Sequence, residues 1–387
     1  AVHAELFPKF PYFLRLQIIR VRRRIAVQIH NLFAEFIAAS ADRKCGYVTT
    51  VEVYDGEKRF STGYTTPPKT RLEEIYSSMA ENGCTDCVME VSSHAIAQNR
   101  VGFGRETIFA GGAFTNLSED HLDYHKTMDE YFRVKLSLAE HIAENNPGAP
   151  YAVCLDGENG SKMFEAVRKL NLNVLPVTAE KPEYDLSDLP LAGDYNKSNV
   201  LLAAALAGAS GIGRETIQSV IPTLKPRWGR LELVKTEASD ADIYVDFAHT
   251  PDGLEKVLKA ARGFTRNRLW VVFGAGGDRD PMKRPLMGEA CASLADKLVV
   301  TSDNPRSEEP MAIISQIMAG VTRANPKTAA HIEVDRRAAI EYALQEAEKG
   351  DVVIIAGKGH ETTQEIAGVK YPFDDREIVR SAKKFLV

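Results

Sequence analysis

Five short polar segments of this 387-residue chain carry side chains that could bind charged ligands or perform acid–base chemistry. Each follows an apolar run, and two of them are rich in glycine, which lets the backbone approach a ligand closely. Any one of these segments could simply be a turn, but five in one chain favour an active cleft. They are residues 90–94, 246–252, 274–280, 303–306 and 357–361.

The segment at residues 116–125 is acidic and contains His121 and His125. With Glu90 it offers carboxylate oxygens and imidazole nitrogens, a mixture that suits Mg²⁺ holding a phosphate group. Zinc fits less well, because the two histidines have no third strong ligand near them in the sequence. The alternative is that Asp120 only caps a helix that begins near His121.

Positive and negative side chains both occur in the later segments. Arg279 and Arg306 could each form two hydrogen bonds to a carboxylate, and Glu361 could accept a hydrogen bond from an ammonium group. Opposite charges in one cleft suggest an amino-acid substrate, which carries both groups. The alternative is that either arginine is an ordinary solvated surface residue.

Parallel β-sheets would position these segments. Continuous apolar runs alternate with helical patterns, which predicts strands that helices cover on both faces of a sheet. In such sheets ligands bind beyond the carboxyl ends of the strands, where the polar segments lie. The expected strands include residues 87–91, 243–246, 269–273, 298–301 and 352–356. A helical stripe, expected to face the core, consists of Met311, Ile314, Ile317, Met318 and Val321.

Length and composition limit the classes of protein that the chain can represent. A chain of 387 residues is too long for one ordinary core, so we expect two α/β domains that meet near residues 224–230. The net charge of −5 argues against a dedicated nucleic-acid-binding protein, and no apolar run is long enough to cross a membrane. The five scattered cysteines do not resemble a disulfide framework and fit a reducing cytoplasm. Cys84 and Cys87 form one CxxC pair, interpreted as part of a buried strand, with a metal or redox site as the alternative.

Taken together, the motifs resemble those of the Mur ligases, and within that family those of the members that add diaminopimelate. The matching motifs are residues 90–95, 115–125, 246–252, 276–280, 283–288, 303–306 and 357–361. The resemblance implies an α/β fold with a central P-loop-like ATPase domain built on a parallel sheet, residues 22–225, and a C-terminal Rossmann-like domain, residues 226–387. The reaction site would lie between the two and be completed by domain closure. Residues 1–21 would be an irregular leader or remnant.

The resemblance also implies a reaction. ATP would phosphorylate the D-glutamate γ-carboxylate of UDP-N-acetylmuramoyl-L-alanyl-D-glutamate, and the amino group of meso-diaminopimelate would attack the acyl phosphate to form an amide in peptidoglycan biosynthesis. A metal and cationic side chains would neutralise charge during phosphoryl transfer. The implied cofactors are ATP and Mg²⁺, and the implied partners are these small molecules only. We expect a cytoplasmic monomer.

Residue roles follow from the matching positions. Glu90, His121 and Lys135 match the catalytic metal ligands. The lysine would be carried as a carbamate, because an unmodified ammonium group would repel the metal. The positions that match contacts to the UDP-dipeptide are Thr65, Thr66, Ser92, Gln98 and Arg100. Those that match nucleotide contacts are Asn196, Asn199, Arg230, Asp246 and His249. Those that match the diaminopimelate pocket are Arg279, Asp303, Asn304, Pro305, Arg306, Gly357 and Glu361.

The sequence also departs from the family pattern. The family has a glycine-rich phosphate loop of the Gly-Thr-Asn-Gly-Lys-Thr-Thr kind after the first strand of the central domain. Residues 25–27 are expected to be that strand, and no such loop separates Val27 from Gln28. The N-terminal domain that binds the UDP group has no counterpart in residues 1–24. Phe247 stands where the family usually has tyrosine.

Two other functions therefore stay open. The chain could be a non-catalytic Mur-ligase-like binding or scaffold protein that lacks the phosphate loop, which predicts no substrate-dependent phosphate release. It could also be a lysine-adding or other ligase of the superfamily, such as a folylpolyglutamate synthase. The Asp-Asn-Pro-Arg sequence at residues 303–306 favours diaminopimelate, because an arginine can pair with the extra carboxylate that lysine lacks.

Overall fold

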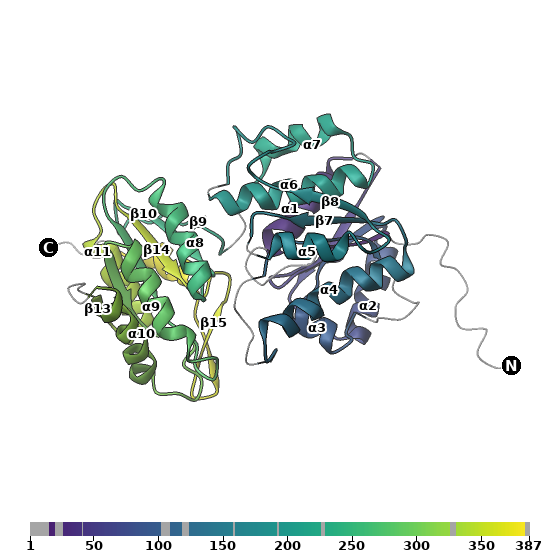
Figure 1. Cartoon of the computed structure of the whole chain (residues 1–387). Helices are drawn as coiled ribbons and strands as arrows, with labels where there is room; N and C mark the ends of the chain where they lie inside the picture. The colour runs from purple at the N-terminus through teal and green to yellow at the C-terminus, as the bar shows by residue number, and fades with distance from the viewer. Residues whose placement is uncertain are drawn as a thin grey trace. The chain divides into compact units, whose positions relative to one another are not determined.

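The computed structural model describes residues 15–19, 26–40, 42–101, 109–117, 124–157, 159–191, 193–225, 229–325 and 330–383. The chain divides into two units (Figure 1). The first comprises residues up to 117, 129–189 and 198–224, and the second comprises 118–128, 190–197 and 225 onward. The described parts of 118–128 and 190–197 therefore group with the second unit, although both precede residues 224–230. No helix among the described residues is long and apolar enough to cross a membrane.

An eight-stranded sheet forms the centre of the first unit, in the strand order β4-β3-β2-β5-β1-β6-β7-β8. Neighbours from β2 to β8 are parallel, whereas β3 and β4 extend the sheet in antiparallel fashion. The strands are β1 (Arg15–Ile19), β2 (Cys45–Val48), β3 (Val53–Tyr54), β4 (Arg59–Phe60), β5 (Asp86–Glu90), β6 (Phe109–Phe114), β7 (Pro150–Cys154) and β8 (Asn173–Val177). The helices up to residue 220 are α1 (Ala26–Ala38), α2 (Lys69–Glu81), α3 (Ser93–Ala97), α4 (Met128–Asn145), α5 (Gly160–Val167), α6 (Asp194–Ala209) and α7 (Arg214–Val220), followed by a 3-10 turn (Ile221–Thr223).

The first strand and the helix after it differ from the sequence prediction. Residues 25–27 were expected to be the strand, but Ala26 and Val27 begin α1, and the strand is β1 instead. β1 pairs in parallel with β5 on one side and β6 on the other, so residues 15–19 are not part of an irregular leader. The prediction was wrong because β1 is short and its place is set by pairing with distant strands rather than by a local pattern.

The connection from β1 to α1 is where a phosphate loop would lie, rather than between Val27 and Gln28. Residues 20–25 read Arg-Val-Arg-Arg-Arg-Ile and contain no glycine. They lie outside the described residues, as do residues 1–14 of the expected leader.

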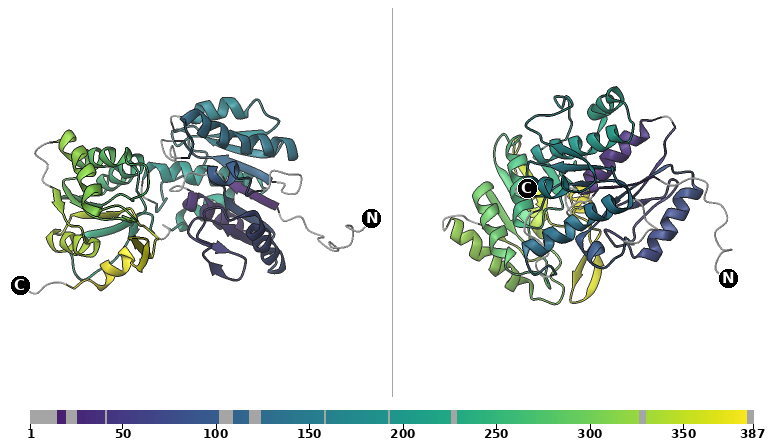
Figure 2. Two further views of the ribbon diagram at one scale, coloured as in Figure 1. Left: turned by 90° about the horizontal axis from the view of Figure 1, so that it is seen from below. Right: turned by 45° about the vertical axis from the view of Figure 1, so that its right-hand side comes forward.

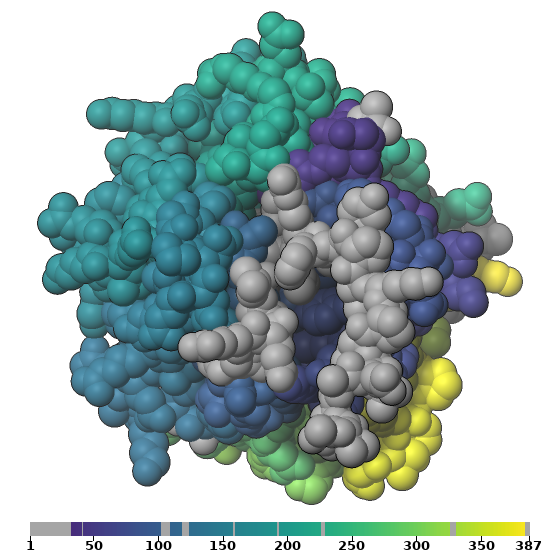
Figure 3. Space-filling view, turned by 90° about the vertical axis from the view of Figure 1, so that its right-hand side faces the viewer, coloured from purple at the N-terminus to yellow at the C-terminus, as the bar shows by residue number. Residues whose placement is uncertain are grey.

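Helix α1 supports the strands that lead to the candidate site of the first unit. Its residues Leu32, Phe33, Phe36 and Ile37 are buried. The helix contacts β2 and β5, and it also contacts α7, beside which it lies in Figure 3. It therefore holds in place the strand whose last residue is Glu90.

The second unit contains a six-stranded sheet in the order β13-β12-β11-β14-β10-β9. All neighbours are parallel except β9 and β10. The strands are β9 (Glu232–Leu233), β10 (Asp242–Asp246), β11 (Leu269–Phe273), β12 (Lys297–Val300), β13 (Ala330–Ile332), β14 (Val352–Ala356) and a separate hairpin, β15 (Thr363–Ile366) and β16 (Val369–Pro372). The helices are α8 (Pro251–Arg262), α9 (Lys283–Leu294), α10 (Pro310–Ala324), α11 (Arg336–Glu346) and α12 (Asp375–Ser381). The parallel strands predicted from the apolar runs are confirmed to within a residue at each end.

Helices cover both faces of the six-stranded sheet (Figure 2), as the continuous apolar strands predicted. Alternate strand residues pack against α8, α9 and α10 on one face and against α11 and α12 on the other. In the predicted stripe of α10, Ile314, Ile317 and Val321 are buried as expected. Met311 is 41% exposed, so its assignment to the core was wrong, and Ile313 is buried instead.

The five cysteines are all buried and free. Cys87 lies in β5, and burial raises the pKa of both the Cys84 and Cys87 thiols. Protonated, buried thiols are poor nucleophiles and poor metal ligands. These observations support the structural interpretation of the CxxC pair.

Candidate active site

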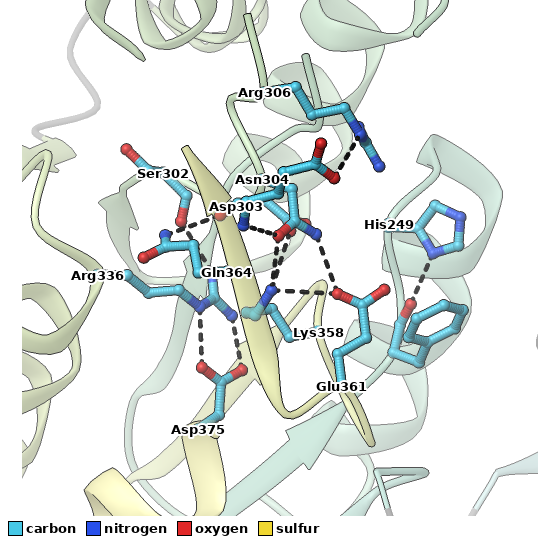
Figure 4. A network of polar contacts seen from close by, with 12 residues as sticks. His249, Ser302, Asp303, Asn304, Arg306, Arg336, Lys358, Glu361, Gln364 and Asp375 are labelled. Carbon is cyan, nitrogen blue, oxygen red and sulfur yellow. Dashed lines mark hydrogen bonds and ion pairs between the residues drawn. The ribbon is translucent and has the colours of Figure 1, made fainter. Parts of the chain in front are cut away.

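Four of the five polar segments meet at one edge of the six-stranded sheet. Strands β10, β11, β12 and β14 are mutually parallel, so the residues that follow them emerge at the same edge. Each leads into one of the predicted segments with at most two residues between. Figure 4 shows side chains of residues 303–306 and 357–361 within one polar network, while His249 contacts the Phe247 carbonyl. These four segments therefore lie at the carboxyl ends of the strands, as the sequence predicted, which is where ligands bind in open parallel sheets.

The loops after β11 and β12 are tied to each other. The Gly277 N–H donates to the Asn304 carbonyl at 2.9 Å, and Arg306 Nη1 donates to the Gly277 carbonyl at 2.6 Å. A Cβ atom at Gly277 would lie 1.9 Å from the Pro305 carbonyl oxygen, so only glycine allows this approach. Pro305 thus shapes the loop through its backbone.

An ion pair between a buried arginine and a half-buried glutamate links these two loops. Arg284 is 1% exposed and donates two hydrogen bonds to Glu308, at 2.8 Å and 2.7 Å, and a third to the Gly276 carbonyl at 3.2 Å. The hydrogen bonds from Arg284 hold the pKa of Glu308 at about 2. Sequence reasoning missed this pair, although Arg284 lies in one of the matching motifs.

The hairpin strand β15 holds the Asp303–Arg306 loop along its length. Gln364 Nε2 donates to the Asp303 carbonyl at 2.8 Å, and the Arg306 N–H donates to the Glu365 carbonyl at 3.0 Å. Arg306 adopts a left-handed backbone with φ of +54°, which places its side chain beside Gly276. Its Nε lies 3.6 Å from the Glu365 carboxylate.

The predicted diaminopimelate residues are brought together here. Asn304 Nδ2 donates to Glu361 Oε2 at 3.0 Å, and Asp303 is 5% exposed. Gly357 has φ of +120°, and a Cβ there would lie 2.7 Å from Asp303 Oδ2. Arg279 is exposed, and its Cγ would lie 3.8 Å from a Cβ at Gly276, close to Arg306. Cations and carboxylates thus share one site, as an amino-acid ligand requires.

Three of the residues predicted to contact the nucleotide, Arg230, Asp246 and His249, lie at or beside the carboxyl end of β10. Asp246 ends β10 and accepts hydrogen bonds from the Leu231 and Ala248 N–H groups at 2.9 Å and 2.7 Å. The Arg230 guanidinium carbon lies 4.8 Å from the centre of the Phe247 ring. The centre of the His249 ring lies 4.6 Å from the centre of the same Phe247 ring. Both Asn196 and Asn199 are buried on α6. The Asp246 carboxylate therefore fixes the backbone at Leu231 and Ala248, while the buried Arg230 guanidinium packs on the Phe247 ring.

His360 lies against this aromatic cluster, with its ring centre 4.9 Å from that of Phe247. Burial and the positive charges of Arg230 and Arg376 lower the pKa of His360 to about 3. Its buried Nδ1 has no hydrogen-bond partner among the described residues. The ring is therefore neutral at pH 7.

We expect His360 to make the stability of the protein depend on pH. An unfolded histidine binds a proton near pH 6.5, whereas the folded one does so only near pH 3. Between these values the unfolded chain binds more protons, so the free energy of unfolding falls as the pH decreases. Urea denaturation at pH 7 and pH 5 should show a loss about 2 kcal/mol larger in the wild type than in His360→Phe. Equal losses in the two proteins would contradict the assignment.

In the first unit, Glu90 ends β5 and is fully buried. Its Oε2 accepts hydrogen bonds from the Thr50 N–H at 2.9 Å and from the Thr50 hydroxyl at 2.6 Å. The same hydroxyl lies 3.1 Å from that of Thr65. Thr50 was missed from the sequence, where no motif includes it. A buried carboxylate with hydroxyls around it is an oxygen-rich site.

Of the remaining predicted dipeptide residues, Thr66 contacts Glu90 directly, and Ser92 and Arg100 contact Thr66. The Thr66 hydroxyl donates to the Glu90 carbonyl at 2.8 Å and accepts from the Ser92 N–H at 3.0 Å. Ser92 caps α3, and Arg100 donates to the Thr66 carbonyl and to Gln98. Thr66 and Ser92 therefore shape the backbone, while the exposed Gln98 remains accessible to a ligand.

Lys135 is not the ordinary surface lysine that a helical position would suggest. It lies on α4, is 2% exposed, and its Nζ lies 5.1 Å from the centre of the Tyr131 ring. His121 lies outside the described residues. No three His, Cys, Asp or Glu side chains among the described residues form a metal cage. The Glu90 site still fits Mg²⁺, which binds through one or two carboxylates together with water and substrate phosphates.

Comparison with known proteins identifies relatives over most of the chain. The Mur ligase middle domain family matches residues 33–189, and the Mur ligase, glutamate ligase domain family matches residues 229–359. The UDP-N-acetylmuramoyl-L-alanyl-D-glutamate--2,6-diaminopimelate ligase of Bacillus licheniformis is 41% identical over 371 residues, covering 90% of this chain and 74% of the relative. Ligase 1 of the same name from Clostridium acetobutylicum is 39% identical over 356 residues, which cover 88% of this chain and 72% of the relative.

Solved structures agree with this result. A structure of a UDP-N-acetylmuramoyl-L-alanyl-D-glutamate--2,6-diaminopimelate ligase aligns with a TM-score of 0.59 at 30% identity, covering 95% of this chain and 78% of that one. Folylpolyglutamate synthase of Mycobacterium tuberculosis aligns with a TM-score of 0.64 at 16% identity, covering 90% and 88%, and shows the shared fold alone.

Proposed function

Given that this chain belongs to the Mur ligase family, we propose that it joins meso-diaminopimelate to UDP-N-acetylmuramoyl-L-alanyl-D-glutamate with the consumption of ATP, in peptidoglycan biosynthesis. The observation that carries the choice of amino acid is the site made by Asn304, Arg306 and Glu361. It places a guanidinium and a carboxylate within one loop network. The relatives of the same name support the choice.

The residues of the second unit would bind and orient the amino acid. Arg306 would pair with a carboxylate of diaminopimelate, and Glu361 would accept a hydrogen bond from an ammonium group. Held in this way, the other amino group, once neutral, can attack the acyl phosphate of the dipeptide. The new C–N bond forms as the C–O bond to phosphate breaks, and the amine loses a proton. Orientation of the two reactants contributes much of the rate enhancement.

The other predicted site residues would serve phosphoryl transfer. Glu90, His121 and Lys135 as a carbamate would hold Mg²⁺, which when bound neutralises charge on the transferred phosphoryl group. Thr65, Gln98 and Arg100 would contact the UDP-dipeptide. Asn196, Asn199, Arg230, Asp246 and His249 would contact or shape the nucleotide site.

A ligase assay tests this function directly. The protein is incubated with ATP, Mg²⁺, the UDP-dipeptide and diaminopimelate, and the tripeptide product and phosphate are measured together. We expect stoichiometric product and phosphate that depend on all three substrates. Product with lysine but not with diaminopimelate would support the lysine-adding alternative instead.

The connection between β1 and α1 decides between the ligase and the non-catalytic alternative. Because residues 20–25 contain no glycine, they lack the sequence of a phosphate-cradling loop. We expect replacement of residues 20–25 by Gly-Thr-Asn-Gly-Lys-Thr to lower the KM for ATP at least tenfold. Activity that exists only after the replacement would show that the natural chain binds substrates without turnover. Activity that the replacement abolishes would contradict the placement of the loop.

A further inference from the structure

We propose that Lys358 is a positioning residue, which orients the Asn304 amide and the Glu361 carboxylate so that together they recognise the carboxylate and the ammonium group of one amino-acid centre. The inference rests on the proposed function of this site and deepens it. Lys358 is not among the residues that sequence comparison with the family assigned to the pocket.

Lys358 is fully buried in the floor of the site, in the segment that follows β14. Its Nζ lies 3.0 Å from Asn304 Oδ1, 3.1 Å from Glu361 Oε2 and 3.8 Å from Asp303 Oδ1 (Figure 4). A lysine ammonium group has three hydrogens to donate and accepts no hydrogen bond. Every neighbour of this Nζ must therefore present an acceptor.

This requirement fixes the Asn304 amide. Its oxygen must face Lys358, and the same oxygen also accepts from the Glu365 N–H at 3.0 Å. Both acceptor positions of the oxygen are thereby used. The amide nitrogen is turned toward Glu361, to which it gives one N–H at 3.0 Å, and its second N–H is available to a ligand.

The same contacts make the two oxygens of the Glu361 carboxylate unequal. Oε2 accepts from both Lys358 and Asn304, which leaves Oε1 to accept from a ligand. The site thus offers a ligand one N–H donor of Asn304 beside one carboxylate oxygen of Glu361. This pair matches the carboxylate and ammonium of an α-amino acid. The buried cation also offsets the negative charges of Asp303 and Glu361, so the site does not favour simple amines.

Calorimetric titration of the full chain with diaminopimelate and with 1,5-diaminopentane, which lacks carboxylates, tests the proposal. In Lys358→Met we expect the Kd for diaminopimelate to rise at least 30-fold and the affinity for diaminopentane to increase. If Lys358→Met does not fold, Lys358→Gln, which keeps N–H donors without the charge, should show the same direction with a smaller change. The double variant Lys358→Met with Glu361→Gln should bind diaminopimelate no more weakly than Glu361→Gln alone.

Arg268→Met is the matched control. Arg268 pairs with the buried Asp351 at 2.8 Å, but at the amino ends of the same sheet. The Arg268→Met variant should have a lower Tm and unchanged Kd values for diaminopimelate and 1,5-diaminopentane. Unchanged diaminopimelate affinity in both Lys358 variants, or additive losses in the double variant, would overturn the positioning role. A wild-type chain that binds diaminopentane and not diaminopimelate would instead contradict the proposed function.

Discussion

Arg306→Met should raise the KM for diaminopimelate about 100-fold while the KM for ATP changes less than twofold. Arg306 is held beside Gly276 by its left-handed backbone and by its hydrogen bond to the Gly277 carbonyl. Its guanidinium is therefore fixed before the amino acid binds, and loses little freedom on binding. Its removal leaves a substrate carboxylate without its partner. Steady-state kinetics with each substrate varied in turn measures the effect.

Lysine provides the internal comparison for this variant. It lacks the second carboxylate, so we expect a low kcat/KM for lysine in the wild type that does not change in Arg306→Met, and the preference for diaminopimelate should be lost. Arg306→Lys should lie between the wild type and Arg306→Met, because a lysine keeps the charge but loses the two-pronged geometry. Arg323→Met is the matched control, since Arg323 is 63% exposed and pairs with Glu289 on the surface. An equal increase in the KM for ATP and the KM for diaminopimelate would contradict the proposed role of Arg306.

Lys135→Met should lower kcat about 1,000-fold with little loss of stability. The side chain is almost completely buried, and methionine has a similar length without the charge. If Lys135 acts as a carbamate, the amine combines with CO₂ and releases a proton to give a carboxylate-like group. Activity of the wild type should therefore fall in CO₂-depleted buffer and return when bicarbonate is added.

Two variants separate the carbamate from other roles of this lysine. Lys135→Glu carries a carboxylate and should retain more activity than Lys135→Met, and neither variant should respond to bicarbonate. Lys162→Met is the control, because Lys162 is 54% exposed and pairs with Asp129. A wild type indifferent to CO₂, with Lys135→Glu as inactive as Lys135→Met, would show that the lysine acts as an unmodified amine.

The pattern of the sequence alone determined the architecture of the second unit. The apolar runs that became β10, β11, β12 and β14 are continuous because both faces of each strand are covered, a property that is visible locally. The polar segments after them were placed correctly for the same reason, since parallel strands end at one edge of a sheet. The motifs also identified the family.

Only the tertiary structure decided which side chains contact one another. β1 was misplaced because its position depends on pairing with β5 and β6 rather than on its own residues. Thr50 lies 40 residues from Glu90 in the sequence, and Lys358 lies 54 residues from Asn304. Hydrogen bonds over such separations depend on how loops pack after the sheets form. The sequence therefore indicated the edge of the sheet at which the proposed amino-acid site lies, and the packed loops determined which atoms are exposed there.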